Sequence, residues 1–167
     1  MLQEIQDQNF LDGFAVGEFT GRLKYQTPLQ IKEWVPLDKI KNFKSVLRKY
    51  NYSITGVSAH LSDPNQVLLA ADKIAEEPNH KMILAFASGD IFMDGWEAGC
   101  LSMMLRCLQP EQVNEWVKVS NLDAIQKVVD KCGYAITSLH IHPEYKKWAQ
   151  LVAQKKPIRD WTSHRAS

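Results

Sequence analysis

The sequence predicts a helix-rich α+β or α/β fold, built from two copies of a unit of about 82 residues. First, the segment 10–73 aligns without a gap with the segment 92–155, and 19 of the aligned pairs are identical, too many for chance. Second, the motif Phe-x-Asp-Gly-aromatic-x-x-Gly begins at Phe10 and again at Phe92. Third, helical and β-branched segments alternate within each copy. We expect a single compact domain over 1–167, with repeat one at about 10–90, repeat two at about 92–167 and a pseudo-two-fold axis.

Composition and charge are those of an ordinary folded domain. Hydrophobic residues make up 45%, charged residues 23%, and the formal net charge is +1. No apolar run approaches the roughly 20 residues that a transmembrane helix needs, so no membrane partner is expected. The polar start, Met1 to Glu4, lacks the pattern of a secretory signal. Three cysteines without metal-type spacing suit a reducing compartment. The sequence therefore predicts a cytoplasmic protein.

Each copy is expected to open with a helix that an aspartate caps, Asp12 in the first and Asp94 in the second. Two glycines four positions apart follow each aspartate, and they leave one stripe of the helix without side chains. Each glycine lowers helix propensity by about 1 kcal/mol relative to alanine. Their presence in both copies predicts a close backbone contact across the seam between the copies.

Two helices are expected next. Thr27-Pro28 followed by Gln30 resembles a capping box and predicts a short helix through Trp34. Apolar residues at helical spacing predict a longer helix over 37–50. This helix is expected to end at Asn51, and its counterpart at Gly133, because both residue types tolerate the left-handed conformation of a helix C-terminus.

Strands are expected over 52–60 and 134–142, which are rich in β-branched residues. Asp63-Pro64 predicts a further helix through Ile74, and 82–87 is expected to be a buried central strand. The second copy has no counterpart of that strand, and the first ten residues are a candidate for its place. We therefore expect a small shared sheet with strands from both halves. Pairing within one chain and exchange with a second chain stay open, so a homodimer is one partner considered.

Histidines are the first candidate site. His140 and His142 lie on one face of the expected strand, with Ile136 and Ser138, and His60 holds the matching position in the first copy. Three converging imidazoles would suit zinc or another divalent metal with an open position. A metal-assisted enzyme is therefore one alternative. The other interpretation is a surface or hydrogen-bonded histidine pair, and since no further ligand stands at a recognised spacing, no cofactor is predicted.

A glutamate–tryptophan pair recurs in both copies, as Glu33-Trp34 and Glu115-Trp116. A carboxylate beside an indole can recognise a cationic or aromatic ligand by charge and cation–π contact. The alternative is a core tryptophan with a solvated neighbour, because adjacent residues on a helix diverge by about 100°.

A basic helix is the third candidate site, and it would serve nucleic acid. Its cations are Lys39, Lys41, Lys44, Arg48 and Lys49. The matching helix of the second copy mixes lysines with aspartates, so only the first copy could act in this way.

No nucleophile elbow, P-loop, dinucleotide-binding motif or zinc-protease motif is present in the sequence. We therefore expect a non-enzymatic binding protein with a small-molecule or protein site in the inter-repeat cleft. The alternatives are a metal-assisted enzyme and a nucleic-acid-binding accessory protein.

Overall fold

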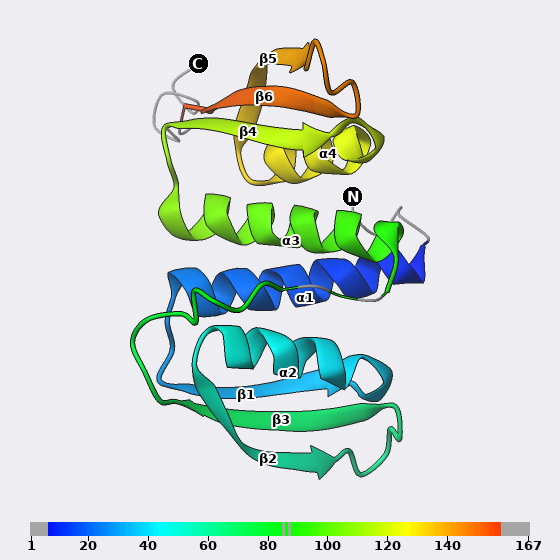
Figure 1. Cartoon of the computed structure of the whole chain (residues 1–167), viewed down its shortest axis with the longest axis vertical. Helices are drawn as coiled ribbons and strands as arrows, with labels where there is room; N and C mark the ends of the chain where they lie inside the picture. Colours follow the sequence, from blue (N-terminus) through cyan, green and yellow to red (C-terminus); the bar gives the residue numbers. More distant parts are fainter. Residues whose placement is uncertain (1–6, 85, 87, 158–167) are drawn as a thin grey trace, which may run out of the picture. The chain divides into compact units, whose positions relative to one another are not determined.

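The computed structural model describes residues 7–84, 86 and 88–157, and it is an α+β protein of helices and antiparallel strands (Figure 1). The chain divides into two compact units, the first ending at Leu108 and the second beginning at Gln109. The order helix, strand, 3-10 turn, helix, strand, strand runs from Gln8 to Lys73 and again from Asp90 to Lys155.

The described residues of the first unit form a three-stranded sheet and three helices. Its elements are α1 (Gln8–Tyr25), β1 (Gln30–Pro36), a 3-10 turn (Leu37–Lys39), α2 (Ile40–Lys49), β2 (Tyr52–Ala59), β3 (Gln66–Lys73) and α3 (Asp90–Leu108). The strand order is β1-β3-β2, with both pairings antiparallel.

The core of the first unit lies between one face of this sheet and the helices α1 and α2. Alternate residues of β1 and β3 point into it, since side chains alternate between the two faces of a strand. Burial of one such Val, Leu or Phe side chain stabilises the fold by roughly 1.5–3 kcal/mol. The buried residues include Ile31, Val35, Val67, Leu69 and Ala71 from the strands, and Val16, Phe19, Leu23, Phe43, Val46 and Leu47 from the helices.

Over its described residues, 109–157, the second unit has a three-stranded sheet of the same plan and one helix. Its elements are β4 (Gln112–Lys118), a 3-10 turn (Val119–Asn121), α4 (Leu122–Lys131), β5 (Tyr134–Ile141) and β6 (Trp148–Lys155). The strand order is β4-β6-β5, again antiparallel, and α4 lies against one face (Figure 1). The core consists of Val113, Val117, Ala149, Leu151 and Ala153 from the strands and Ile125, Val128 and Val129 from α4.

Within the first unit, α1 and α3 pack through their glycines. A Cβ atom built on Gly13 would lie 1.9 Å from the carbonyl oxygen of Phe92, and one on Gly95 would lie 2.0 Å from that of Phe10. Gly17 and Gly99 repeat the reciprocal pattern, at 2.1 Å from the carbonyl oxygen of Trp96 and 2.2 Å from that of Phe14. The predicted close contact between these helices is confirmed. Only residues without a Cβ atom permit this separation.

Two predicted helices are strands. The segment that begins at Thr27-Pro28 forms β1, and the segment that begins at Asp63-Pro64 forms β3. In both, buried residues alternate with less buried ones, as a strand with one covered face requires. In each of these two segments only a few apolar positions fit the period of a helix, and pairing in the sheet decides the structure.

The expected helix caps are also wrong. Asp12 and Asp94 lie inside helices, because α1 begins at Gln8 and α3 at Asp90. Asp7 caps α1 instead, and its carboxylate accepts a hydrogen bond of 2.9 Å from the backbone N–H of Asn9.

No shared sheet and no strand at 82–87 occur in the described residues. Each three-stranded sheet takes all its strands from one half. Ile83 is 86% exposed, while Leu84 and Phe86 pack as irregular chain on the core of the first unit. Residues 85 and 87 of the predicted strand, and residues 1–6 of its proposed replacement, lie outside the described residues.

The predictions for α2, β2 and β5 are confirmed, and a bulge changes one detail. Asn51 and Gly133 follow α2 and α4 with φ of 60° and 87°, as expected for helix ends. The register of β5 shifts between Ile136 and Ser138, which turns Ile136 toward the covered face opposite Ala153. In the part of the chain that the structure describes, no helix has the length and apolar character needed to cross a membrane.

Candidate functional site

Each sheet presents an exposed tryptophan beside a histidine on its open face. Trp34 is 51% exposed, and its ring centroid lies 4.7 Å from that of His60. Trp116 is 48% exposed and lies 5.2 Å from His142. The structure therefore brings together the predicted Trp34 with His60 in the first unit, and Trp116 with His142 in the second. The expectation that these tryptophans lie on helices is wrong.

The two histidines also shape the loops that follow β2 and β5. His60 Nδ1 accepts the backbone N–H groups of Ser62, at 3.1 Å, and Asp63, at 3.0 Å. His142 Nδ1 accepts those of Glu144 and Tyr145, both at 3.0 Å. Each ring is thereby held with Nδ1 as the acceptor, which leaves Nε2 to carry the proton.

The glutamates of the repeated pair lie on the opposite side of their strands from the tryptophans. Glu33 is in register with buried Leu69, and Glu115 with buried Leu151. The carboxylate and the indole therefore do not form one recognition surface on the open face, because neighbouring strand residues alternate between faces.

A groove of about 310 Å³ lies in the first unit among α1, α3 and β1. Its floor is apolar, with Phe19, Val35 and Phe43, and the rings of Phe19 and Phe43 meet edge to face at 5.1 Å. Its wall includes both Glu33 and Trp34 of the predicted site. Glu33 and Trp34 are thus predicted ligand-binding residues that line this groove. Residues of both predicted repeats enclose it. The remaining lining residues are Ala15, Glu18, Arg22, Pro36, Met103 and Arg106.

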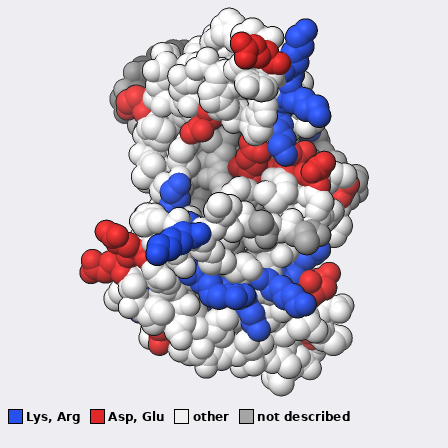
Figure 2. All heavy atoms as spheres, viewed as in Figure 1, with Lys and Arg blue, Asp and Glu red and all other residues white. Residues whose placement is uncertain are grey.

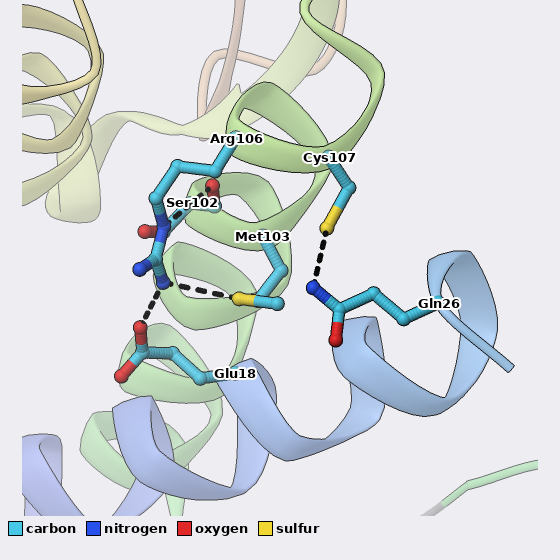
Figure 3. Close-up of polar contacts among 6 residues, drawn as sticks. All are labelled: Glu18, Gln26, Ser102, Met103, Arg106 and Cys107. Carbon is cyan, nitrogen blue, oxygen red and sulfur yellow. Dashed lines mark hydrogen bonds and ion pairs between the residues drawn. The ribbon is translucent and has the colours of Figure 1, made fainter. Parts of the chain in front are cut away.

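Two ion pairs cross this groove. Arg22 pairs with Glu33, and Arg106 pairs with Glu18. Arg106 also donates to the sulfur of Met103 at 3.0 Å, and nearby the side chain of Gln26 donates to the Sγ atom of Cys107 at 3.6 Å (Figure 3). All four charged side chains keep between 31% and 50% of their surface exposed. The arginines were not predicted, because nothing in their spacing distinguishes them from other surface cations.

A larger hollow of about 500 Å³ lies beside Thr27, Leu29 and Lys73 of the first unit. None of the residues predicted to form a site lines it, and the Nζ atom of Lys73 donates to the carbonyl oxygen of Glu76 at 3.3 Å. We therefore regard the groove of Glu33 and Trp34 as the better candidate.

The predicted basic residues lie on and around α2. Figure 2 shows a group of Lys and Arg side chains on the surface of the first unit. Two of them also serve the packing of that unit. Lys39 lies 5.6 Å from the ring of Phe92, and Lys49 donates to the carbonyl oxygens of Asn79 and Met82 at 2.8 and 2.7 Å. Lys41 and Arg48 are exposed, while Lys44 is half-buried. Nucleic-acid binding by this helix stays a prediction.

Among the described residues, no group of three or more His, Cys, Asp or Glu side chains is arranged to hold a metal ion. His60 belongs to the first unit, and His140 and His142 belong to the second, so their convergence stays a prediction. Within its own unit, each of His60 and His142 accepts hydrogen bonds from the loop that follows its strand.

Burial affects two ionisable groups next to the seam. Burial raises the pKa of the Cys100 thiol to about 12, and it raises the pKa of the Tyr50 hydroxyl to about 12. Both groups are therefore neutral at physiological pH, so Cys100 is a poor nucleophile there.

No protein-family model, curated protein or solved structure matches the chain.

Proposed function

We propose that this is a non-enzymatic, cytoplasmic binding protein that holds an extended segment of a protein partner in the groove of its first unit. One observation carries the proposal: four consecutive residues, 33–36 of β1, line that groove. Consecutive strand residues point to opposite faces, so all four line one groove only where it follows the edge of the strand.

A strand edge offers a mode of recognition. In the described part of the chain, β1 pairs with β3 on one side and with no strand on the other. An extended peptide can add to such an edge through main-chain hydrogen bonds, while pockets for alternate side chains supply specificity. The apolar floor formed by Phe19, Val35 and Phe43 gives one pocket for an apolar side chain. An open groove of this kind suits a peptide better than a small molecule, which is usually bound in an enclosing cavity.

The ion pairs favour binding of a charged partner. Arg22–Glu33 and Arg106–Glu18 are partly exposed, and pairs of this kind contribute roughly 0–1 kcal/mol to stability. A partner carboxylate can therefore replace Glu18 or Glu33 on an arginine at little cost to the fold. We expect preferred peptides to carry an acidic residue near an apolar one.

The finer features of the fold belong to the same proposal. The reciprocal glycine contacts of α1 and α3 support an origin by duplication of one unit with two-fold packing. Cys100 and Cys107 form no disulfide among the described residues, as is usual in a reducing compartment.

Selection from a displayed library of random 12-residue peptides tests the proposed function. We expect recovered peptides to bind the wild-type protein and to lose at least tenfold in affinity with Trp34→Ala or Arg22→Ala. The matched control is Trp116→Ala, which removes an equally exposed indole from the other sheet and leaves peptide affinity unchanged. Thermal unfolding is measured for each variant, because an exposed tryptophan contributes little to the core.

Two results would contradict the proposal. One is a library that yields no binding peptide above background. The other is a set of peptides whose affinity does not respond to Trp34→Ala and Arg22→Ala while both variants stay folded.

A further inference from the structure

The open face of the second sheet carries a row of aromatic side chains. The rings of Trp116 and His142 lie 5.2 Å apart, and those of His142 and Tyr145 lie 4.9 Å apart. Tyr145 is 64% exposed and Trp148, at the start of β6, is 37% exposed. Large aromatic side chains are usually buried, so an exposed row of this kind indicates a binding surface.

Amide side chains share this face with the rings. The side chain of Gln150 donates to Asn114 Oδ1 at 2.7 Å. Amides both donate and accept hydrogen bonds, as the polar edges of nucleobases require. Gln112, Asn114, Gln150 and Gln154 all occupy open-face positions of β4 and β6.

The charge of this face is positive. No Asp or Glu occupies an open-face position of β4, β5 or β6, since Glu115 is in register with buried Leu151 on the other face. The cations are Lys118 at the end of β4 and the exposed Lys146 and Lys147 before β6. Glu144, in the loop that follows β5, is the acidic residue nearest in the chain to Lys146 and Lys147, and Glu115 is the one nearest to Lys118.

We propose that this face binds single-stranded nucleic acid, with bases stacked on Trp116, Tyr145 and Trp148 and phosphates near the lysines. Aromatic platforms flanked by positive charge bind single strands, whose bases are free to stack, and they do so with little sequence preference. A duplex keeps its bases inside and lacks this contact. A neutral oligosaccharide also stacks on aromatic rings, but it gains nothing from the lysines. This site is separate from the peptide groove of the proposed function, and neither proposal depends on the other.

The first sheet provides a matched comparison. Its Trp34 and His60 correspond to Trp116 and His142, but Leu68 and Asp72 stand where the second sheet has Gln150 and Gln154. Asp63 and Gln66 stand where the second copy has Tyr145 and Trp148, and Asp72 offsets the exposed Lys32 of β1. The face of the first sheet therefore lacks both the aromatic row and the excess of positive charge, and it should not bind the same ligand.

Fluorescence anisotropy with a labelled 15-nucleotide oligothymidylate tests the proposal on the full chain. We expect Trp116→Ala to weaken binding about tenfold, because base stacking on one aromatic side chain is worth that much. Tyr145→Ala, in an exposed loop, should weaken it in the same direction, and Trp34→Ala should leave it unchanged. With three lysines at phosphates, the slope of log affinity against log salt should be about −2. Replacing Lys118, Lys146 and Lys147 with glutamine should flatten that slope.

Several results would overturn the proposal: no binding of the oligonucleotide, equal binding of the matching duplex, or equal loss with Trp34→Ala. Binding of cellohexaose that Trp116→Ala abolishes, without oligonucleotide binding, would assign the face to carbohydrate instead. Circular dichroism shows whether each variant keeps its fold. If Trp116→Ala unfolds the protein, the binding loss of Tyr145→Ala tests the proposal in its place.

Discussion

Replacing Gly17 with alanine should separate α1 from α3. The added Cβ atom would lie 2.1 Å from the carbonyl oxygen of Trp96, whereas ordinary contacts of a Cβ begin at 3.4 Å. The obstacle is backbone, which cannot rotate away as a side chain does. The two helices must therefore shift apart at this point, because real Cβ contacts essentially never lie below 3.0 Å.

The cost follows from competing effects. Alanine favours the helix by about 1 kcal/mol relative to glycine. Overpacking costs about 1–3 kcal/mol and occasionally more. In addition, a gap of about 0.5–1 Å between the two helices forfeits about a quarter to a half of the dispersion energy of the contacts that it opens. Because a backbone atom is met, we take an overpacking cost of about 4 kcal/mol, above the ordinary range. The free energy of unfolding should then fall by about 3 kcal/mol, once the gain in helix propensity is subtracted.

Urea unfolding of the full chain, followed by circular dichroism and tryptophan emission, measures this loss. Trp96 reports on the seam directly, because its indole N–H donates to Thr20 Oγ1 at 3.1 Å. Gly56→Ala is the control, since a Cβ atom there meets nothing within 4 Å. A loss with Gly17→Ala of less than about 0.5 kcal/mol, which is the range of ordinary surface substitutions, would refute the steric explanation. A loss no larger than that of the control would refute it equally.

Two further predictions concern pH and backbone conformation. Burial raises the pKa of Cys100 from 9.0 and of Tyr50 from 10.0, both to about 12. Their contribution to the free energy of unfolding is therefore complete below about pH 9 and is lost as pH rises toward 12. Urea titrations at pH 8, 10 and 11 check this, and a constant free energy of unfolding would contradict it. Gly133 has φ of 87° and open space around it, so Gly133→Ala should cost about 1–2 kcal/mol through backbone strain alone. Gly133→Asn should cost less, because Asn51 adopts φ of 60° at the matching position. Equal urea midpoints for the two variants would contradict this.

Much of the fold was predictable where sequence signals were long or repeated. The glycine stripe at Gly13 and Gly17 predicted the close helix contact because glycine inside a helix needs a compensating reason. The helix over 37–50 spans enough residues for its period to be clear. Both features occur in both halves of the chain, which gave each observation independent support.

The errors came from short segments. In β1, Ile31, Trp34 and Val35 fit a helical face, yet Ile31 and Val35 also fit the alternation of a strand, and so short a segment does not separate the two periods. Proline after Thr27 and Asp63 favours the start of a helix, but it equally marks a loop before a strand. Pairing with β3, a partner distant in sequence, decided the outcome for β1.

The candidate site was predictable only in part. The repeat identified Trp34 and Trp116. Both side chains are exposed, so packing of the core does not explain why they recur. The pairing of each tryptophan with His60 or His142 depends on strand register across the sheet, which the sequence does not encode locally. Arg106 reaches the groove from α3, and only the packing of that helix on α1 brings it there.

The reciprocal glycine contact has a consequence for a chain made of two similar halves. Gly13 meets Phe92 as Gly95 meets Phe10, so each helix offers its partner the same surface. Such a self-complementary surface is what two separate molecules use in an isologous pair. A polypeptide with one half could cover its glycine stripe only by meeting a second molecule, so its stability would depend on concentration. When the two halves are linked in one chain, that encounter becomes intramolecular. The effective concentration of one helix near the other then depends on the connection between β3 and α3, and not on the amount of protein present.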